Sequence, residues 1–150
     1  MAYRTPSEIA ATSVNAGVAK SRAGTVTLIV LGFLAGSFIA MAAVASHTVS
    51  YALGAWAGPS AAKLISGLVF SVGIVMVIIG GGELFTGNSL MVMALLDRRI
   101  RVGALIRNWV IVYFSNMAGA VFVAWLYHET GLWQTADGAS AQALIMTAMR

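Results

Sequence analysis

A run of glycines and short polar residues interrupts a long apolar stretch in the middle of this 150-residue chain. The run comprises Gly80, Gly81, Gly82, Glu83, Leu84, Phe85, Thr86, Gly87 and Asn88. Its four glycines disfavour a helix. Irregular backbone survives inside a membrane only where protein buries it or where it lines a wet cavity. We therefore expect unwound backbone that faces a polar passage rather than lipid.

Glu83 is the only acidic residue inside an apolar span, where an unpaired carboxylate is costly. It would act either as a proton carrier or substrate ligand, or as a brace that accepts hydrogen bonds from loop amides. We favour the brace, because the neighbouring glycines supply amides and a bare carboxylate would repel an anion.

The residues that follow Glu83 also allow two roles each. Thr86 offers one donor and two acceptor positions without a charge, which suits contact with a partly dehydrated anion. Its structural alternative is a bond to a backbone carbonyl. Leu84 and Phe85 could form an apolar constriction that gates polar solutes by excluding water, or they could pack in the core. Spacing alone does not decide between these roles.

The composition is that of a membrane protein. Hydrophobic residues make up 59% of the chain and charged residues 9%, whereas a soluble domain is about one-quarter charged. The sequence contains no cysteine, which excludes disulfides and thiolate metal sites within it, and no pattern calls for a cofactor. The net charge is +4, but the basic residues flank apolar runs instead of forming a basic stripe. We therefore exclude a nucleic-acid partner.

The first quarter of the chain predicts a short helix and then a membrane span. Thr5, Pro6 and Glu8 form a capping box with proline at the first helical position, so residues 1–24 should hold a helix. This helix would lie at the membrane interface or, alternatively, form a solvated tail. Residues 25–46 are uncharged and long enough to cross the hydrocarbon core.

A face of small residues runs along this first span. Its members are Gly32, Gly36, Ser37 and Ala40. Small residues at this spacing let a second helix approach closely. After this span, residues 47–59 are predicted to form a loop.

The following apolar stretch predicts one interrupted span, at residues 64–96 with the break at 80–88. Basic residues precede the first span and follow this region, and they are Arg4, Lys20, Arg22, Arg98, Arg99, Arg101 and Arg107. The positive-inside rule places both clusters in the cytoplasm, which requires two crossings between them. The N-terminus should therefore be cytoplasmic. Residues 105–127 form a third span, and residues 139–150 begin a fourth helix.

Several motifs together resemble the formate/nitrite transporter family. The matching residues are 82–88, Asn108, Trp109 and 116–119, with Lys63, Leu64 and 70–73 upstream. The resemblance covers the chain from the N-terminal helix onward. Its most specific element is the glycine–acid–Leu–Phe–Thr loop within a broken second helix.

The resemblance implies an all-α, aquaporin-like channel built from two inverted repeats. Residues 25–150 would then form the first repeat and the start of the fourth helix, and the remaining C-terminal half of the protein would supply the second repeat. It further implies a homopentamer in the inner (cytoplasmic) membrane. Each protomer would pass a small monovalent anion such as nitrite, formate or hydrosulfide.

The resemblance also implies roles for individual residues. Phe70 and Ile74 would contribute to an outer slit. Leu84 would help form an inner slit, with Phe85 beside it, and Thr86 would face the chamber between the slits.

Gly82, Glu83, Gly87 and Asn88 would hold the loop. The family's central histidine, proposed to protonate the anion, belongs to the second repeat. The Gly87 that follows the threonine slightly favours the nitrite and hydrosulfide branches.

We therefore predict a channel or transporter for small monovalent anions and not an enzyme. An intramembrane enzyme that uses Glu83 is the first alternative, but the sequence offers no second catalytic group at membrane depth. A scaffold subunit that transports nothing is the second alternative, but it has no need of a span broken by glycines.

Overall fold

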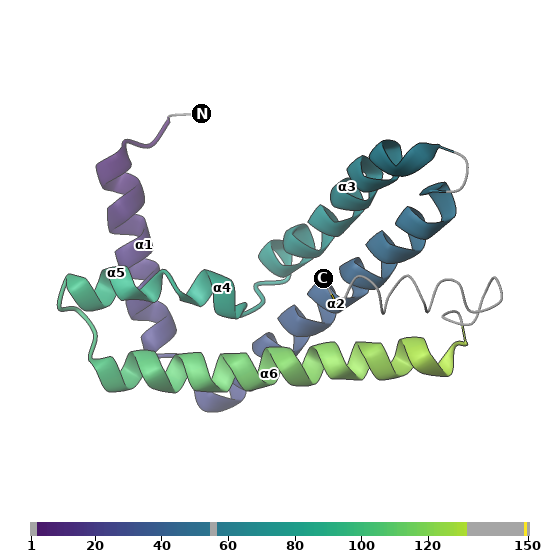
Figure 1. Cartoon of the computed structure of the whole chain (residues 1–150). Helices are drawn as coiled ribbons and strands as arrows, with labels where there is room; N and C mark the ends of the chain where they lie inside the picture. The colour runs from purple at the N-terminus through teal and green to yellow at the C-terminus, as the bar shows by residue number, and fades with distance from the viewer. Residues whose placement is uncertain (1–2, 55–56, 132–148, 150) are drawn as a thin grey trace.

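The computed structural model describes residues 3–54, 57–131 and 149, and all regular structure among them is helical. The helices are α1 (Pro6–Ser21), α2 (Thr25–Gly54), α3 (Gly58–Ile79), α4 (Phe85–Asn88), α5 (Met91–Leu96) and α6 (Val102–Glu129). Figure 1 shows α2 and α3 side by side as a hairpin, α6 crossing α2 in contact with it, and α1 crossing α5. The predicted all-α class is therefore confirmed.

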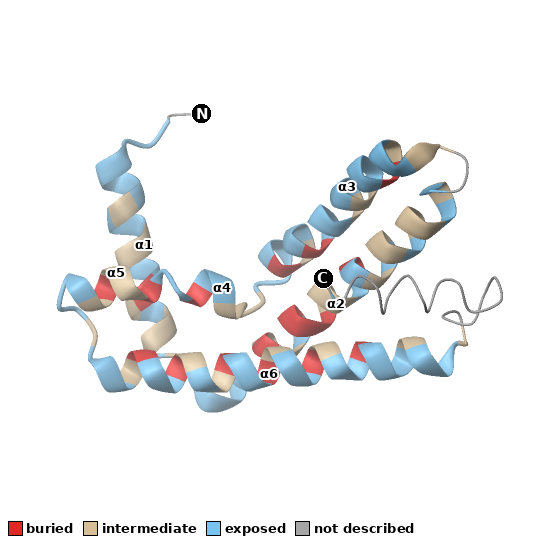
Figure 2. Ribbon diagram, in the orientation of Figure 1, coloured by how far each residue is buried: buried red, intermediate tan, exposed pale blue. Residues whose placement is uncertain are grey.

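Three of these helices are long and apolar enough to cross a membrane: α2, α3 and α6. The shortest, α3, has 22 residues, which at 1.5 Å per residue span about 33 Å and match a hydrocarbon core of roughly 30 Å. Figure 2 shows exposed residues along all three helices. Many of them are large and apolar, as expected of surfaces that lipid or other protein covers.

Small residues bring α2 and α6 into backbone contact, as the sequence predicted for Gly32 and Gly36. A Cβ on Gly36 would overlap the backbone of Asn116, and a Cβ on Gly119 would overlap the carbonyl oxygen of Phe33. The Ser37 hydroxyl bridges the same interface, because it lies 2.9 Å from the Phe33 oxygen and 3.3 Å from the Gly119 oxygen.

Several predicted boundaries are wrong. Residues 47–54 continue α2 rather than forming a loop, because residues 47–53 contain neither glycine nor proline, and the helix ends only at Gly54. The second span begins at Gly58 rather than at residue 64. The interruption is shorter than 80–88, since the chain is helical again from Phe85. The helix expected at 139–150 lies, except for Met149, outside the described residues.

The two basic clusters lie at the same end of the helices. Arg107 donates to the carbonyl oxygen of Ala23 and to the Thr25 hydroxyl, the latter at 2.7 Å. Arg99 donates to the Asn15 side chain at 2.7 Å. The segments before α2 are thus tied to the first turns of α6 and to the loop before it, which agrees with the charge argument. The capping box at Thr5 and Glu8 is also present.

Candidate functional site

The glycine run stops α3 by a specific hydrogen-bond pattern. Gly81 adopts φ 65°, its N–H lies 3.3 Å from the Ile78 oxygen, and the Gly82 N–H lies 2.8 Å from the Val77 oxygen. Paired bonds of this kind around a left-handed residue form the Schellman motif, in which glycine avoids a steric penalty. The helix therefore ends at Ile79, and the predicted unwound backbone is present at residues 80–84.

Neighbouring helices anchor the unwound segment. The Glu83 N–H donates to the Leu31 oxygen of α2 at 3.1 Å. Asn116 of α6 donates from Nδ2 to the oxygens of Gly32 and Glu83, both at 2.8 Å, and its Oδ1 accepts the Phe85 N–H at 2.9 Å. The loop is therefore clamped between α2 and α6.

The carboxylate of Glu83 belongs to a network of polar side chains. Its Oε2 lies 2.7 Å from Lys20 Nζ and 2.8 Å from Asn88 Nδ2. Lys20 also donates to Asn88 Oδ1 at 2.9 Å, and Asn88 donates to Asn108 Oδ1 at 2.8 Å. Asn88 and Asn108 are fully buried. Every charged or amide group that faces this cluster thus has a complementary partner, as buried polar groups require.

We expected Glu83 to brace the loop by accepting hydrogen bonds from the glycine amides, but it does not accept them. Those of Gly80, Gly81 and Gly82 are used in ending α3, so the carboxylate turns instead to Lys20 and Asn88. A lysine partner offsets the desolvation of the carboxylate in a way that neutral amides would not.

A hollow of about 430 Å³ lies beside the break and is bordered by the loop, the end of α3 and Lys20. Three of the predicted pore residues, Ile74, Leu84 and Thr86, line it, together with Glu83 and Asn88. The Thr86 hydroxyl makes no hydrogen bond to any residue that the structure describes. An apolar leucine and an uncharged hydroxyl therefore share the same wall.

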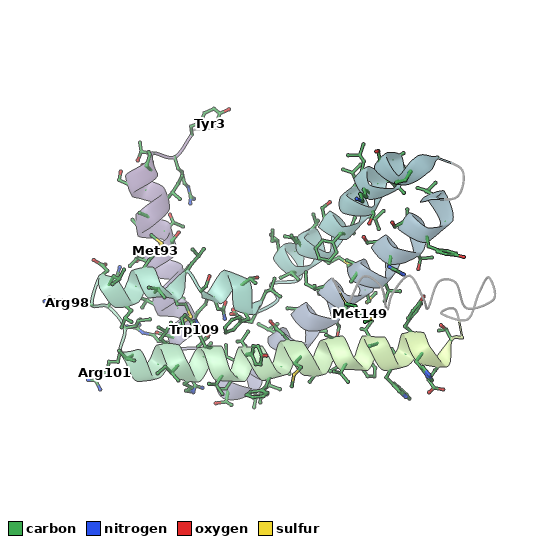
Figure 3. All side chains as sticks on the ribbon, in the orientation of Figure 1. Tyr3, Met93, Arg98, Arg101, Trp109 and Met149 are labelled. Atoms are coloured by element: carbon green, nitrogen blue, oxygen red, sulfur yellow. The ribbon has the colours of Figure 1, made fainter. Side chains whose placement is uncertain are left out.

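Phe70 and Phe85 are placed differently from these three. Phe70 lies one turn before Ile74 on α3, is partly exposed and does not border the hollow. The ring of Phe85 packs edge-on against Trp109 and Tyr113 of α6, with centroids 6.0 and 5.5 Å apart. Figure 3 labels Trp109, whose indole N–H also donates to the Asn88 oxygen at 3.0 Å.

Sequence reasoning missed the parts that the other helices contribute. From the sequence, Lys20 is predicted only to contribute to the membrane topology, and Asn108 and Asn116 are identified only as residues of the family motif. The available signal was that a carboxylate in an apolar span requires a cation, and Lys20 is one of few lysines in the chain. Among the described residues, no group of three or more acidic, histidine or cysteine side chains could hold a metal.

Comparison with known proteins decides the family. A family profile described as "Formate/nitrite transporter" matches residues 7–150. The chain belongs to the formate/nitrite transporter family. This is a family of transporters rather than enzymes, which supports the prediction that the chain is not an enzyme.

Individual relatives agree with this assignment. The chain is 43% identical to the uncharacterized transporter YrhG of Bacillus subtilis, over 90% of the chain and 51% of the relative. It is 39% identical to a probable formate transporter of Methanothermobacter thermautotrophicus (95% and 53%) and 34% identical to the formate channel FocA of Escherichia coli K12 (95% and 50%). The chain thus spans about half the length of the curated relatives that it matches.

Proposed function

We propose that this chain forms the first repeat of a channel for small monovalent anions, namely formate, nitrite or hydrosulfide. Family membership supports transport, and relatives named as formate channels or transporters support a small carboxylate-sized anion. The observation that carries the proposal is the break in the second span, whose loop borders a hollow at Leu84 and Thr86.

The loop geometry suits passage of an anion because its own carboxylate is neutralised. An unpaired Glu83 carboxylate beside the hollow would repel an anion. The ammonium of Lys20 lies 2.7 Å from that carboxylate, so the pair presents little net charge to an anion farther away. Dry constrictions, one at Leu84 and one at Ile74, would still impose a large desolvation penalty on a charged solute. Transient protonation of the anion to a small neutral acid would lower that penalty.

We assign the predicted pore residues accordingly. Leu84 and Ile74 would narrow the passage and Thr86 would offer a hydrogen bond to the anion inside it. Phe70 would extend the α3 side of the outer slit. Phe85 would support the constriction from behind, since its ring packs on α6. Gly82, Glu83, Gly87 and Asn88 would maintain the loop.

The assembly is part of the proposal. An aquaporin-like inverted arrangement would need a second repeat from a C-terminal half, and the exposed apolar faces of α3 and α6 provide surfaces for that half and for neighbouring protomers of a homopentamer. The joined basic clusters would lie on the cytoplasmic side of the inner membrane, together with the N-terminus.

Liposome flux tests the function. We expect the purified protein to carry formate, nitrite or hydrosulfide into vesicles. Thr86→Val should slow that flux, because Thr86 carries the only hydroxyl among the described residues that line the hollow. Thr48→Val is the matched control, since Thr48 bonds only within α2. No flux of any of the three anions above protein-free vesicles would refute the proposal.

The same vesicles separate the two alternatives. Glu83→Gln would abolish turnover in an enzyme that uses this carboxylate, whereas a channel would keep a measurable part of its flux. A scaffold would show no flux in the unmodified protein.

A further inference from the structure

The side chain of Asn116 occupies the place that a neighbouring β-strand would take beside the broken segment. Leu84 is extended, with φ −98° and ψ 130°. In an extended chain the C=O of the preceding residue and the N–H of the following residue point to the same side. Here these groups belong to Glu83 and Phe85, and both bond to the Asn116 amide, at 2.8 and 2.9 Å.

The orientation of the amide is fixed by its partners. The oxygens of Gly32 and Glu83 can only accept hydrogen bonds, so both face Nδ2, and the Phe85 N–H can only donate, so it faces Oδ1. Two hydrogen bonds therefore lock the residues on either side of Leu84 to Asn116 of α6, and the third ties the same amide to α2.

We propose that Asn116 is a positioning residue that holds the Leu84 side chain in the wall of the passage. This inference rests on the proposed channel function. Because Asn116 lies on the opposite side of the strand-like segment from the backbone groups of Leu84 itself, it fixes the direction of that side chain without touching the solute. The hollow is bordered by Leu84 but not by Asn116.

The rest of the loop has other anchors, so the effect should be local. The Schellman bonds hold Gly81 and Gly82, and the Glu83 N–H bonds to Leu31. The Glu83 carboxylate is held by Lys20. Loss of the Asn116 amide would free the peptide groups next to Leu84 and leave these bonds in place.

Cysteine labelling tests the proposal, because the chain contains no native cysteine. Leu84→Cys would be reacted with a membrane-impermeant thiosulfonate in the reconstituted protein, in the native background and with Asn116→Ala. We expect about fivefold faster labelling or more in the Asn116→Ala background, the ratio that corresponds to one net hydrogen bond. Ser37→Ala is the matched control, since Ser37 bridges α2 and α6 without touching the loop.

A second reporter distinguishes loop release from general loosening. Ile74 lies on α3 and lines the same hollow. The labelling rate of Ile74→Cys should change by less than about twofold, which is less than the loss of one hydrogen bond would give. If Asn116→Ala does not fold, Asn116→Asp keeps the acceptor for Phe85 but loses both donors, and it should also accelerate labelling of Leu84→Cys.

Unchanged labelling of Leu84→Cys, or equal acceleration at Ile74→Cys, would overturn the role of Asn116. The labelling does not depend on anion flux. Failure of the channel proposal therefore shows in the vesicle assay, and failure of this inference shows in the labelling.

Discussion

The ion pair between Lys20 and Glu83 offers the sharpest test of how the broken span is held. The two side chains are 30% and 13% exposed, and Nζ lies 2.7 Å from Oε2. An exposed pair contributes about 0.2–1 kcal/mol, whereas removing one partner from a buried pair costs about 3–5 kcal/mol. This pair is part-buried, so its loss should fall between these limits.

The two single substitutions should differ in cost. Lys20→Met leaves the Glu83 carboxylate with only Asn88 as a side-chain donor, so we expect a loss of about 2–3 kcal/mol in the free energy of unfolding. Glu83→Gln leaves Lys20 with an amide oxygen and Asn88 Oδ1 as acceptors, so its cost should be about 1 kcal/mol. The double variant, with Lys20→Met and Glu83→Gln together, leaves no unpaired charge. Its loss in the free energy of unfolding should be smaller than the sum of the two single losses by at least about 1 kcal/mol.

Unfolding of the purified protein by SDS in mixed micelles, followed by tryptophan fluorescence, gives these free energies. Lys63→Met is the matched control, because Lys63 is exposed on α3 and lies outside the network; its effect should be within about 0.5 kcal/mol. Additive effects of the two network substitutions would refute the argument that Lys20 is needed to neutralise Glu83.

Two further predictions concern packing and pH. Gly119→Ala should destabilise the protein by about 2 kcal/mol or more, since the new Cβ would meet the backbone of Phe33, whereas the control Gly67→Ala meets no atom within 4 Å; equal unfolding free energies for the two variants would contradict the packing. The hydrogen bonds from Thr5 lower the pKa of Glu8. The cap's contribution to the stability of α1 is therefore present above the ordinary pKa of a glutamate, and it is lost as the pH falls through the lower, folded-state pKa. Hydrogen exchange of α1, corrected for intrinsic rates, should show this loss in the native protein but not in Glu8→Gln, and the same pH dependence in both would contradict the capping role.

The features that the sequence could predict are those that depend on local chemistry. The glycines at 80–82 stop α3 because Gly81 adopts the left-handed conformation there, and such a stop needs no distant partner. The cap at Thr5 and the apolar spans are equally local. The close packing at Gly36 followed from residue size alone.

The features that could not be predicted depend on contacts between distant residues. The helix restarts at Phe85 where Asn116, 31 residues away, accepts its N–H. Lys20 reaches Glu83 from 63 positions earlier, and no periodicity links the two. The continuation of α2 through residues 47–54 has a simpler cause, since interfacial aromatic residues and polar residues do not by themselves end a helix.

The way in which the loop is held also determines what it presents to a solute. Its backbone groups at Glu83 and Phe85 are bonded to α2 and α6, and its carboxylate is bonded to α1. Lys20, Glu83 and Asn88 also line the hollow, but they are hydrogen-bonded to one another. The wall therefore meets a solute with groups that include the apolar side chain of Leu84 and the uncharged hydroxyl of Thr86. Such a wall has no fixed array of donors that would match one anion's shape. We therefore expect the passage to discriminate by size and by the ease of desolvation, and to separate formate, nitrite and hydrosulfide only weakly.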